Sequence, residues 1–242
     1  MAEQQITPIA IWPGLEDGVP KPIMPYSPAI RLGDWVFIAG QLASDFKTGV
    51  PKELIPKSGG SSTGLQLQSD FIFKNMAQTV QAAGANMRTD AVKIWEWFVS
   101  NKPDAQDIAS GNNAHHVDIN SYERSLHQAF DNKCPSRSSI GIKELMWLGT
   151  KIELEVMCLI TEDKTTYYNL DSDPEKPGAL RKGDWVFISN QNSENHKGEI
   201  PESLEAQFDV VMSKITELSE RSGSSLENAV KAEVFISHPN DF

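Results

Sequence analysis

The chain of 242 residues contains only two cysteines, Cys134 and Cys158, which lie far apart and outside any CxxC pair. A disulfide framework or a thiolate zinc site needs closely spaced cysteines, so neither is indicated. His115, His116 and Asp118 look like metal ligands at first sight. Adjacent side chains diverge on any regular backbone, however, and no further ligand stands at a recognised spacing. We therefore expect no metal site.

Basic residues are also scarce, with 22 Lys and Arg against 33 Asp and Glu, for a formal net charge of −11. No basic cluster stands out, and an acidic surface repels phosphate backbones, so we expect no nucleic-acid partner. Long hydrophobic runs are absent: no apolar stretch approaches the roughly 18 residues of a membrane helix. The N-terminus lacks the basic start and apolar core of a secretory signal. These features predict a soluble cytoplasmic protein without a membrane partner.

The most informative feature is a doubled segment. RLGDWVFIAGQ (Arg31–Gln41) returns as RKGDWVFISNQ (Arg181–Gln191), identical at eight of eleven positions, 150 residues further on. Such a recurrence, at a spacing close to the size of a small domain, indicates duplication of a folding unit. We expect an N-terminal arm over residues 1–24, a complete domain over 25–163 and a partial or degenerate second domain over 164–242.

The first unit has the pattern of an α+β domain. Gly33-Asp34 predicts a hairpin turn inside 29–42, and apolar spacing predicts helices over 65–83 and 119–130. Strands are predicted over 90–99, 138–145 and 151–160. The order β-β-α-β-α-β-β corresponds to one mixed sheet with helices on one face. The proline-rich N-terminus predicts an extended arm.

The second unit repeats this order only in part. A hairpin over 181–191, a helix over 204–220 and a strand over 229–236 are predicted. The second helix and last two strands have no equivalent in the sequence. The sheet edge of this unit therefore needs another segment or subunit to cover it.

Few residues are candidates for chemistry from pattern alone. The planar donors of Arg137, in PSRSS, could hold a carboxylate through two parallel hydrogen bonds. The alternative is a structural ion pair between Arg137 and Glu153 or Glu155. These two glutamates alternate with apolar residues and so share one face of a strand. On a covered face they would be general acid/base candidates, whereas on a solvated face they are ordinary surface glutamates.

Several motifs in this order resemble the Rid family, the YjgF-like reactive-intermediate deaminases historically labelled L-PSP endoribonucleases. They are PYSPAIRLGDWVFIAGQ (25–41), KTG (47–49), AAGA (82–85), PSRSSIGIKEL (135–145) and KIELEV (151–156). The resemblance implies a chorismate-mutase-like fold, usually trimeric with sites between subunits. It also implies cofactor-free hydrolysis of an enamine or imine, such as a 2-aminoacrylate-like or aminomuconate-like compound, to a keto compound and ammonia.

The resemblance also implies roles for individual residues. Arg137 would hold the substrate carboxylate, and Glu153 would position or activate the attacking water. Tyr26 would line the pocket, and Gly40 would offer a backbone contact. An anchored carboxylate orients the imine for a water molecule, so this set is chemically coherent.

Other positions depart from the family pattern. Ala39 replaces the usual serine before the glycine, and Ser139 replaces a frequent cysteine. The pocket asparagine is placed at Asn120, after an insertion. In the second copy Lys176 and Asn190 stand at the positions of Tyr26 and Gly40, so we expect no competent site from that copy's residues alone.

Three hypotheses follow from these observations. The first is an enamine or imine deaminase acting on a small carboxylate-bearing intermediate, in a homo-oligomer such as a trimer-like ring. The second is a non-catalytic module of the same fold that binds small carboxylates or supports assembly. The third, a ribonuclease, rests on the old family label, and the charge of −11 argues against it.

Overall fold

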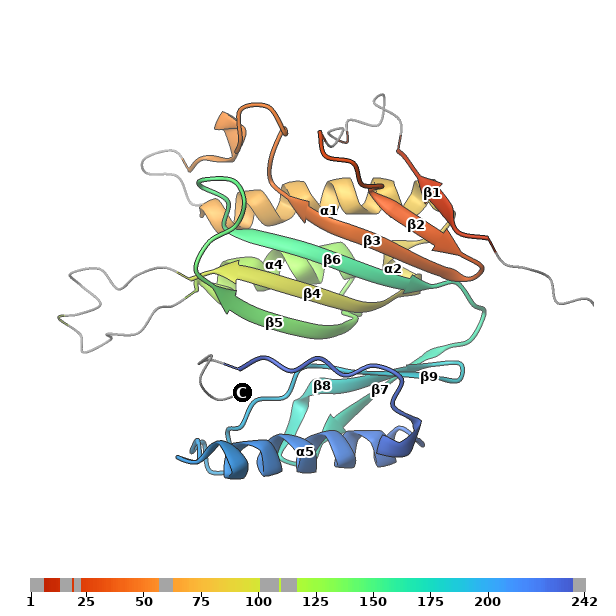
Figure 1. Cartoon of the computed structure of the whole chain (residues 1–242), viewed down its shortest axis with the longest axis vertical. Coiled ribbons are helices and arrows are strands. Elements are labelled where there is room, and N and C mark those ends of the chain that lie inside the picture. The colour runs from red at the N-terminus through yellow and green to blue at the C-terminus, as the bar shows by residue number, and fades with distance from the viewer. Residues whose placement is uncertain are drawn as a thin grey trace, which may run out of the picture. The chain divides into compact units, whose positions relative to one another are not determined.

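The computed structural model describes residues 7–13, 19, 23–56, 63–100, 109 and 117–236. The chain divides into two compact units, Met1–Glu162 and Asp163–Phe242, each with its own sheet (Figure 1). Each unit is described by itself below.

The first unit contains a six-stranded mixed sheet in the order β1-β2-β3-β6-β4-β5. Strands β4 and β5 run parallel, and every other neighbouring pair is antiparallel. The strands are β1 (Ile9–Ile11), β2 (Ala29–Leu32), β3 (Trp35–Leu42), β4 (Ala91–Val99), β5 (Ser136–Ile142) and β6 (Ile152–Leu159). The predicted α+β class and mixed sheet are confirmed.

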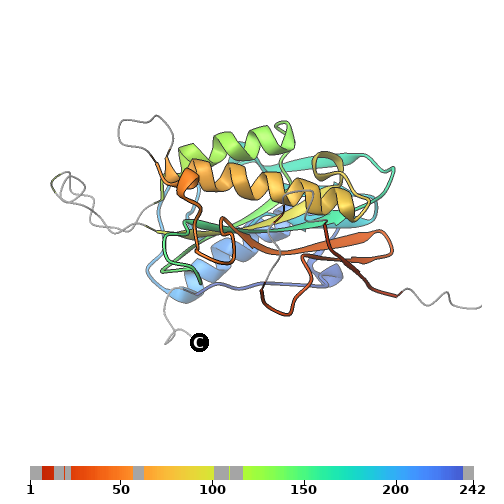
Figure 2. The same ribbon diagram turned by 90° about the horizontal axis from the view of Figure 1, so that it is seen from above.

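Two long helices, α1 (Gly64–Ala82) and α4 (Ile119–Phe130), lie side by side over one face of this sheet (Figure 2). The hydroxyl of Thr63 begins α1 by accepting a hydrogen bond from the N–H of Gln66 at 3.2 Å, which satisfies one of the free N–H groups of the first turn. A short helix α2 (Met87–Asp90) and a 3-10 turn η2 (Lys52–Leu54) complete the unit. Both long helices agree with the predicted ranges.

The core lies between the helices and the sheet. Its largest buried side chains include Ile72 and Met76 of α1, and Tyr122, Leu126 and Phe130 of α4. Each fully buried side chain of this size stabilises the fold by about 1.5–3 kcal/mol through removal of apolar surface from water. The apolar side chains of β6 complete the core from the sheet side. Side chains between them point to the opposite face.

Two expectations for the first unit need correction. Residues 9–11 of the predicted arm form strand β1, which pairs with β2 through Ala10 and Ile30. Strand β5 begins at Ser136, two residues earlier than predicted, so Arg137 lies within the strand and not in the connection before it. Apart from Ala109, the insertion over 101–116 is outside the described residues.

The second unit contains a three-stranded antiparallel sheet, β7-β8-β9, and one long helix. The elements are β7 (Thr165–Leu170), β8 (Asp173–Lys182), β9 (Trp185–Ile188), α5 (Leu204–Arg221) and a 3-10 turn η3 (Leu226–Asn228). Leu170, Ala179 and Leu218 form a small buried core. The hairpin and helix agree with prediction, whereas β7 was not predicted. Phe208 of α5 is exposed.

The strand predicted over 229–236 is absent from the structure. Val230 and Val234 in this segment are 82% and 69% exposed. In the first unit the corresponding strand, β4, is hydrogen-bonded on both sides, by β6 and β5. The described residues of the second unit contain no strands equivalent to β5 and β6, the two neighbours between which β4 lies in the first unit.

The two units share a local structure at the hairpin turn. In the first, Nε of Arg31 donates to the Gly33 carbonyl at 3.0 Å and Nη1 donates to the Ala83 carbonyl at 2.9 Å. In the second, Nε of Arg181 donates to the Gly183 carbonyl at 3.0 Å. Its Nη1 donates to the carbonyl of Ser222 at 2.8 Å. We call this pair of hydrogen bonds the arginine contact; it joins the hairpin to the carbonyl that follows the long helix.

The helix ends match as well. Gly84 and Gly223 follow α1 and α5 with φ of +78° and +74°, the left-handed conformation that glycine adopts without a steric penalty. A Cβ at Gly84 would lie 2.6 Å from Nη1 of Arg31. A Cβ at Gly223 would lie 2.8 Å from Nη1 of Arg181. Both positions therefore need glycine for two reasons, conformation and space.

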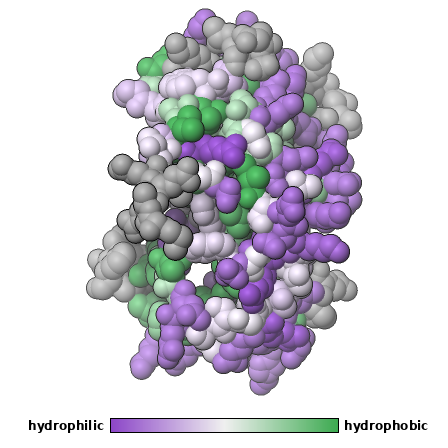
Figure 3. Space-filling view, turned by 90° about the vertical axis from the view of Figure 1, so that its right-hand side faces the viewer, coloured by the Kyte–Doolittle hydropathy of each residue, from purple (hydrophilic) through white to green (hydrophobic). Residues whose placement is uncertain are grey.

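The surface reflects the acidic, polar composition of the chain. On the face drawn in Figure 3, hydrophilic residues predominate and apolar residues form separate groups between them. None of the described helices combines the length and the apolar character needed to cross a lipid bilayer.

Candidate functional site

The predicted site residues fall into two groups within the first unit. We call Tyr26, Gly40 and Glu153 the glutamate cluster. We call Arg137 and Ser139, together with the residues that bind them (Glu96, Tyr122 and Glu123), the arginine cluster. The two clusters belong to opposite faces of the sheet.

Strand register establishes which face each cluster occupies. Glu96 is paired with Leu154, a core residue, so its side chain points toward the helices. Trp97, the next residue, is paired with Glu153, which therefore points to the other face. Arg137 binds Glu96 and a residue of α4, so it lies on the helix side.

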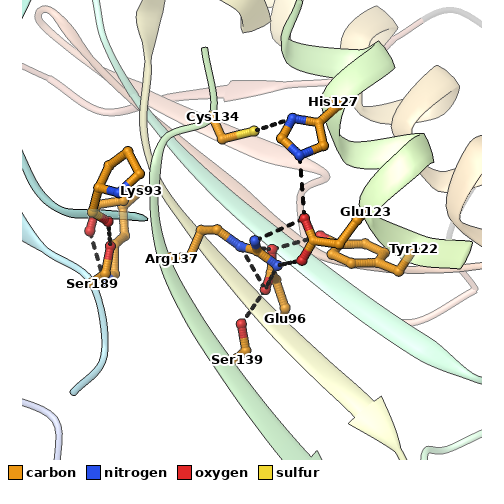
Figure 4. A network of polar contacts seen from close by, with 11 residues as sticks. Lys93, Glu96, Tyr122, Glu123, His127, Cys134, Arg137, Ser139 and Ser189 are labelled. Atoms are coloured by element: carbon orange, nitrogen blue, oxygen red, sulfur yellow. Dashed lines mark hydrogen bonds and ion pairs between the residues drawn. The ribbon is translucent and has the colours of Figure 1, made fainter. Parts of the chain in front are cut away.

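Both edges of the Arg137 guanidinium are occupied (Figure 4). On one edge, Nε lies 3.0 Å from Oε1 of Glu96 and Nη2 lies 3.1 Å from its Oε2. On the other edge, Nη1 lies 3.2 Å from Oε2 of Glu123 and Nη2 lies 2.9 Å from its Oε1. Paired N–H groups that meet both oxygens of a carboxylate form the strongest class of charged hydrogen bond.

Glu96 is the buried centre of this cluster, with a side chain that is 0% exposed. The hydroxyl of Tyr122 donates to its Oε1 at 2.7 Å, and the hydroxyl of Ser139 donates to its Oε2. The Arg137 guanidinium carbon also lies 5.8 Å from the centre of the Tyr122 ring, within range of a cation–π attraction. Each oxygen of Glu96 therefore accepts from the guanidinium and from a hydroxyl.

Burial and the charge of Glu96 shift the pKa values of the residues around it. Burial alone would lower the pKa of Arg137, but the Glu96 carboxylate raises it, so the guanidinium stays charged. Burial first, and then Glu96, raises the pKa of Tyr122 well above its usual range, which keeps its hydroxyl a donor. Burial raises the pKa of Cys134 to about 11. The Cys134 thiol, 3.8 Å from Nδ1 of His127, is thus protonated at neutral pH and a poor nucleophile.

A β-bulge shapes the glutamate cluster. Ile38 pairs with Val156 and Gln41 pairs with Leu154, so Ala39 and Gly40 together stand opposite a single residue of β6. Bulges of this kind bend a strand and redirect its side chains, and they are common beside active sites.

Gly40 lies directly against Glu153. A Cβ at Gly40 would be 2.0 Å from Oε1 of Glu153. The carboxylate therefore occupies the space that any other residue's side chain would fill. The backbone contact that the resemblance implied for Gly40 stays a prediction.

Glu153 binds its proton more tightly than a surface glutamate does. Its pKa is raised, chiefly by burial and then by the negative charge of Glu155. The pKa of Tyr26 is raised by burial and then by Glu153. Glu155 itself accepts a hydrogen bond from Nε1 of Trp97 at 3.1 Å. A half-buried carboxylate with a raised pKa is a group suited to proton transfer.

The structure also describes the surroundings of other residues named in the sequence analysis. The alternative ion pair of Arg137 with Glu153 or Glu155 is not formed, because these glutamates lie on the opposite face of the sheet. Asn120 is exposed on the first turn of α4, and no hydrogen bond within the described residues links it to either cluster. The N–H of Ala39 donates to the Pro28 carbonyl at 3.0 Å, so it is used within the fold. His115 and His116 lie outside the described residues.

Sequence reasoning missed Glu96, Tyr122 and Glu123. A signal for Glu96 was present: it stands among apolar residues of β4, two positions from Ile94 and Phe98, and so shares their buried face. A buried carboxylate requires a partner, and a buried arginine was already a candidate. The bulge also had a signal, because glycine inside a strand often marks one.

The second unit contains a cavity of about 430 Å³. Its lining includes Arg181 and Arg221. Arg181 is bound to backbone carbonyls through the arginine contact, and Arg221 is ion-paired with Asp171 and Glu217. Both arginines therefore serve the structure of this unit. Within the part of the chain that the structure describes, no three His, Cys, Asp or Glu side chains gather as metal ligands.

The first unit is thus a mixed α+β domain with helices on one face and a carboxylate and an arginine on separate faces of its sheet. The chain belongs to the family described as Endoribonuclease L-PSP, whose model matches residues 17–160. This description is the older label of the Rid family, and the predicted membership is confirmed.

Individual relatives agree with this membership. A protein of Dermatophagoides farinae named 2-iminobutanoate/2-iminopropanoate deaminase is 29% identical over 142 residues, 58% of this chain and 90% of that protein. A RutC family protein of Pyrococcus abyssi is 35% identical over 75 residues, 31% of this chain and 51% of the relative.

Among solved structures, TdcF of E. coli with bound serine is 23% identical, with a TM-score of 0.44, over 63% of this chain and 99% of that one. The Rid family protein YyfA of Yersinia pestis is 19% identical, with a TM-score of 0.45, over 64% of this chain and 100% of that one.

Proposed function

We propose that the chain is a cofactor-independent deaminase that hydrolyses a carboxylate-bearing enamine or imine to a keto compound and ammonia. Membership of the family and the deaminase-named relative support imine deaminase activity at family level. The observation that carries the proposal for this chain is Glu153, a half-buried carboxylate with a raised pKa, seated against the backbone of Gly40.

The chemistry requires two proton transfers. Water adds to the carbon of the C=N bond while the nitrogen is protonated, giving a carbinolamine. The carbinolamine then loses ammonia and becomes the keto compound, so that R₂C=NH and H₂O give R₂C=O and NH₃. Glu153 takes a proton from the attacking water and returns it to the departing nitrogen. Tyr26, beside Glu153, lines the pocket on the same face.

The site requires a second copy of the chain. Within one chain Glu153 and Arg137 lie on opposite faces of the sheet, so one molecule does not present both to the same substrate. In the proposed oligomer, a trimer-like ring, the glutamate cluster of one copy faces the arginine cluster of the next. Arg137 then anchors the substrate carboxylate while Glu153 acts on the reacting carbon.

We also propose that the second unit is a degenerate copy of the first. The arginine contact, the left-handed glycine after the helix and the doubled hairpin sequence support this origin. The second copy contributes no residue equivalent to Arg137 or Glu153.

One structural observation favours the alternative, a non-catalytic module that binds carboxylates or supports assembly. Both edges of Arg137 already hold carboxylates from the chain itself. An arginine satisfied in this way can serve the fold without binding any substrate.

The deciding experiment couples the protein to an L-amino-acid oxidase with catalase and follows keto-acid release above the spontaneous rate. We expect acceleration by the wild type and loss of it in Glu153→Gln. Glu144→Gln, at an exposed residue nine positions before Glu153, is the control for loss of one charge. Keto-acid release at the spontaneous rate, together with stabilisation by a keto acid in thermal unfolding, would favour the binding module instead.

A further inference from the structure

We propose that Glu123 is the specificity-determining residue of the arginine cluster: it occupies the edge of Arg137 that a substrate carboxylate needs. A substrate therefore gains access to Arg137 by displacing Glu123. This inference rests on the proposed function for the identity of the substrate, and on the geometry of Arg137 for the competition itself.

The two carboxylates on Arg137 differ in how firmly they are held. Glu96 extends from the middle of a strand, has no exposed side-chain surface and accepts hydrogen bonds from Tyr122 and Ser139. Removal of Glu96 from Arg137 would leave buried charges without partners, which is strongly unfavourable. Glu96 therefore fixes the position and plane of the guanidinium.

Glu123 is held more weakly. It is on α4 and its side chain is 29% exposed; among the described residues its charged contacts are Arg137 and Nε2 of His127, the latter at 3.6 Å. The His127 side chain is itself 51% exposed. When Glu123 rotates away, water can solvate its carboxylate, so the outer edge of Arg137 can exchange one carboxylate for another at small cost.

Charge sets the class of substrate that benefits from this exchange. With Glu96 and Glu123 both present, two carboxylates face one guanidinium. When a monocarboxylate replaces Glu123, two carboxylates again face the guanidinium, so the net gain in binding free energy is small. A dicarboxylate brings an additional negative charge beside Glu96 and the displaced Glu123, which like-charge repulsion disfavours. The arginine cluster thus selects imino acids with one carboxylate and an uncharged side chain.

The test compares Glu123→Gln with Glu144→Gln, which removes the same charge at an exposed position. Calorimetry measures the binding of 2-oxobutanoate and of 2-oxoglutarate, two keto acids that need no turnover. Glu123→Gln is expected to strengthen binding of 2-oxobutanoate about tenfold, in the range of a charge-assisted hydrogen bond, and of 2-oxoglutarate by more. Glu144→Gln is expected to leave both unchanged. Glu123→Ala also removes the carboxylate that competes with the ligand, so it should strengthen binding of both keto acids as well.

Steady-state kinetics separates this inference from the proposed function. In an active enzyme, Glu123→Gln should lower KM for the monocarboxylate imine and leave kcat nearly unchanged, because the competition affects binding. Tighter keto-acid binding without any turnover would uphold the competition and reject the deaminase. Turnover by the wild type, with KM and keto-acid affinity unchanged in both Glu123 variants, would overturn the inference and leave the deaminase intact.

Discussion

Glu153 and Arg137 leave the sheet of the first unit on opposite faces. Glu153 stands on β6 opposite Trp97, outside the helix-covered core, while Arg137 on β5 binds Glu96 and Glu123 on the helix side. The sheet therefore separates the group that would move protons from the group that would hold a carboxylate. This separation is the reason for the proposal that the substrate lies between two molecules.

A methyl group at Gly40 should slow proton transfer without unfolding the domain. Gly40→Ala places a Cβ where Oε1 of Glu153 now lies, at 2.0 Å, so the carboxylate must move. A displacement of this kind is expected to lower kcat/KM about 10²-fold. Gly141→Ala is the matched control, because a Cβ there meets nothing within 4 Å. Equal activity of the two variants would show that the position of Glu153 is unimportant.

Glu155 should control the pH at which Glu153 ionises. Because the charge of Glu155 contributes to the raised pKa of Glu153, Glu155→Gln should lower that pKa toward its ordinary value. Carbon-13 NMR titration of the Glu153 carboxyl group measures this directly. The acidic limb of the kcat/KM profile should move to lower pH in the same variant. A pH profile that Glu155→Gln leaves unchanged would show that Glu153 is not the catalytic base.

The same shift predicts how stability depends on pH. Burial raises the pKa of Glu153 in the folded state, so the folded protein holds this proton more tightly than the unfolded chain. The resulting stabilisation is present below the unfolded pKa and is lost as the pH rises through the folded pKa. Glu153→Gln, which cannot ionise, should therefore gain stability relative to wild type as the pH increases through this window. Urea unfolding at several pH values provides the measurement, and an opposite slope would contradict it.

Loss of Glu96 should destabilise the first unit severely. Glu96→Leu leaves a largely buried Arg137 without its main partner, and removal of one member of a buried pair typically costs about 3–5 kcal/mol. Since Arg137 is 26% exposed, we expect about 3 kcal/mol in the free energy of unfolding. The double variant Glu96→Leu/Arg137→Met, with an apolar pair in place of the ions, should recover much of this loss. A double variant less stable than Glu96→Leu would show that the unpaired charge of Arg137 is not the cause of the loss of stability.

Gly223 should be more sensitive to substitution than another left-handed glycine of the same unit. Gly223→Ala meets the backbone penalty of about 1–2 kcal/mol and also displaces Arg181, 2.8 Å from the new Cβ. Gly198 also has φ of +78°, but a Cβ there would lie 3.5 Å from the nearest atom, Oε1 of Glu194, which is an ordinary contact distance. Gly198→Ala therefore measures the backbone penalty alone. The excess loss of stability in Gly223→Ala, by thermal or urea unfolding, reports the arginine contact, and no excess would show that Arg181 adapts freely.

Local pattern was sufficient to predict most of the first unit. The turn at Gly33 and the apolar spacing of 65–83 and 119–130 are properties of neighbouring residues, so hairpin and helices follow from sequence. The pairing of Arg137 with Glu96 is different, because it depends on two parallel strands that are distant in the chain. Only the sheet order brings these residues together, and the family resemblance, which identified Arg137, contained no information about Glu96.

The second unit shows where periodicity fails. Residues 229–236 have the composition of a strand, but the described residues of the second unit contain no equivalents of β5 and β6, the neighbours of β4 in the first unit. Thr165–Leu170 is the converse: its β-branched and aromatic residues are typical of a strand, and the structure pairs them with β8. Both segments have the intrinsic preference of a strand, and of the two Thr165–Leu170 forms one.

The arginine contact gives this chain an internal comparison that few proteins offer. Arg31 and Arg181 make the same hydrogen bonds to the same kind of helix end, one beside a six-stranded sheet and the other beside a three-stranded one. Hydrogen exchange at Gly84 and Gly223 would therefore report the opening of one structural element in two surroundings under identical solvent conditions. The ratio of the two exchange rates measures how strongly the rest of a domain restrains a contact whose own chemistry is held constant.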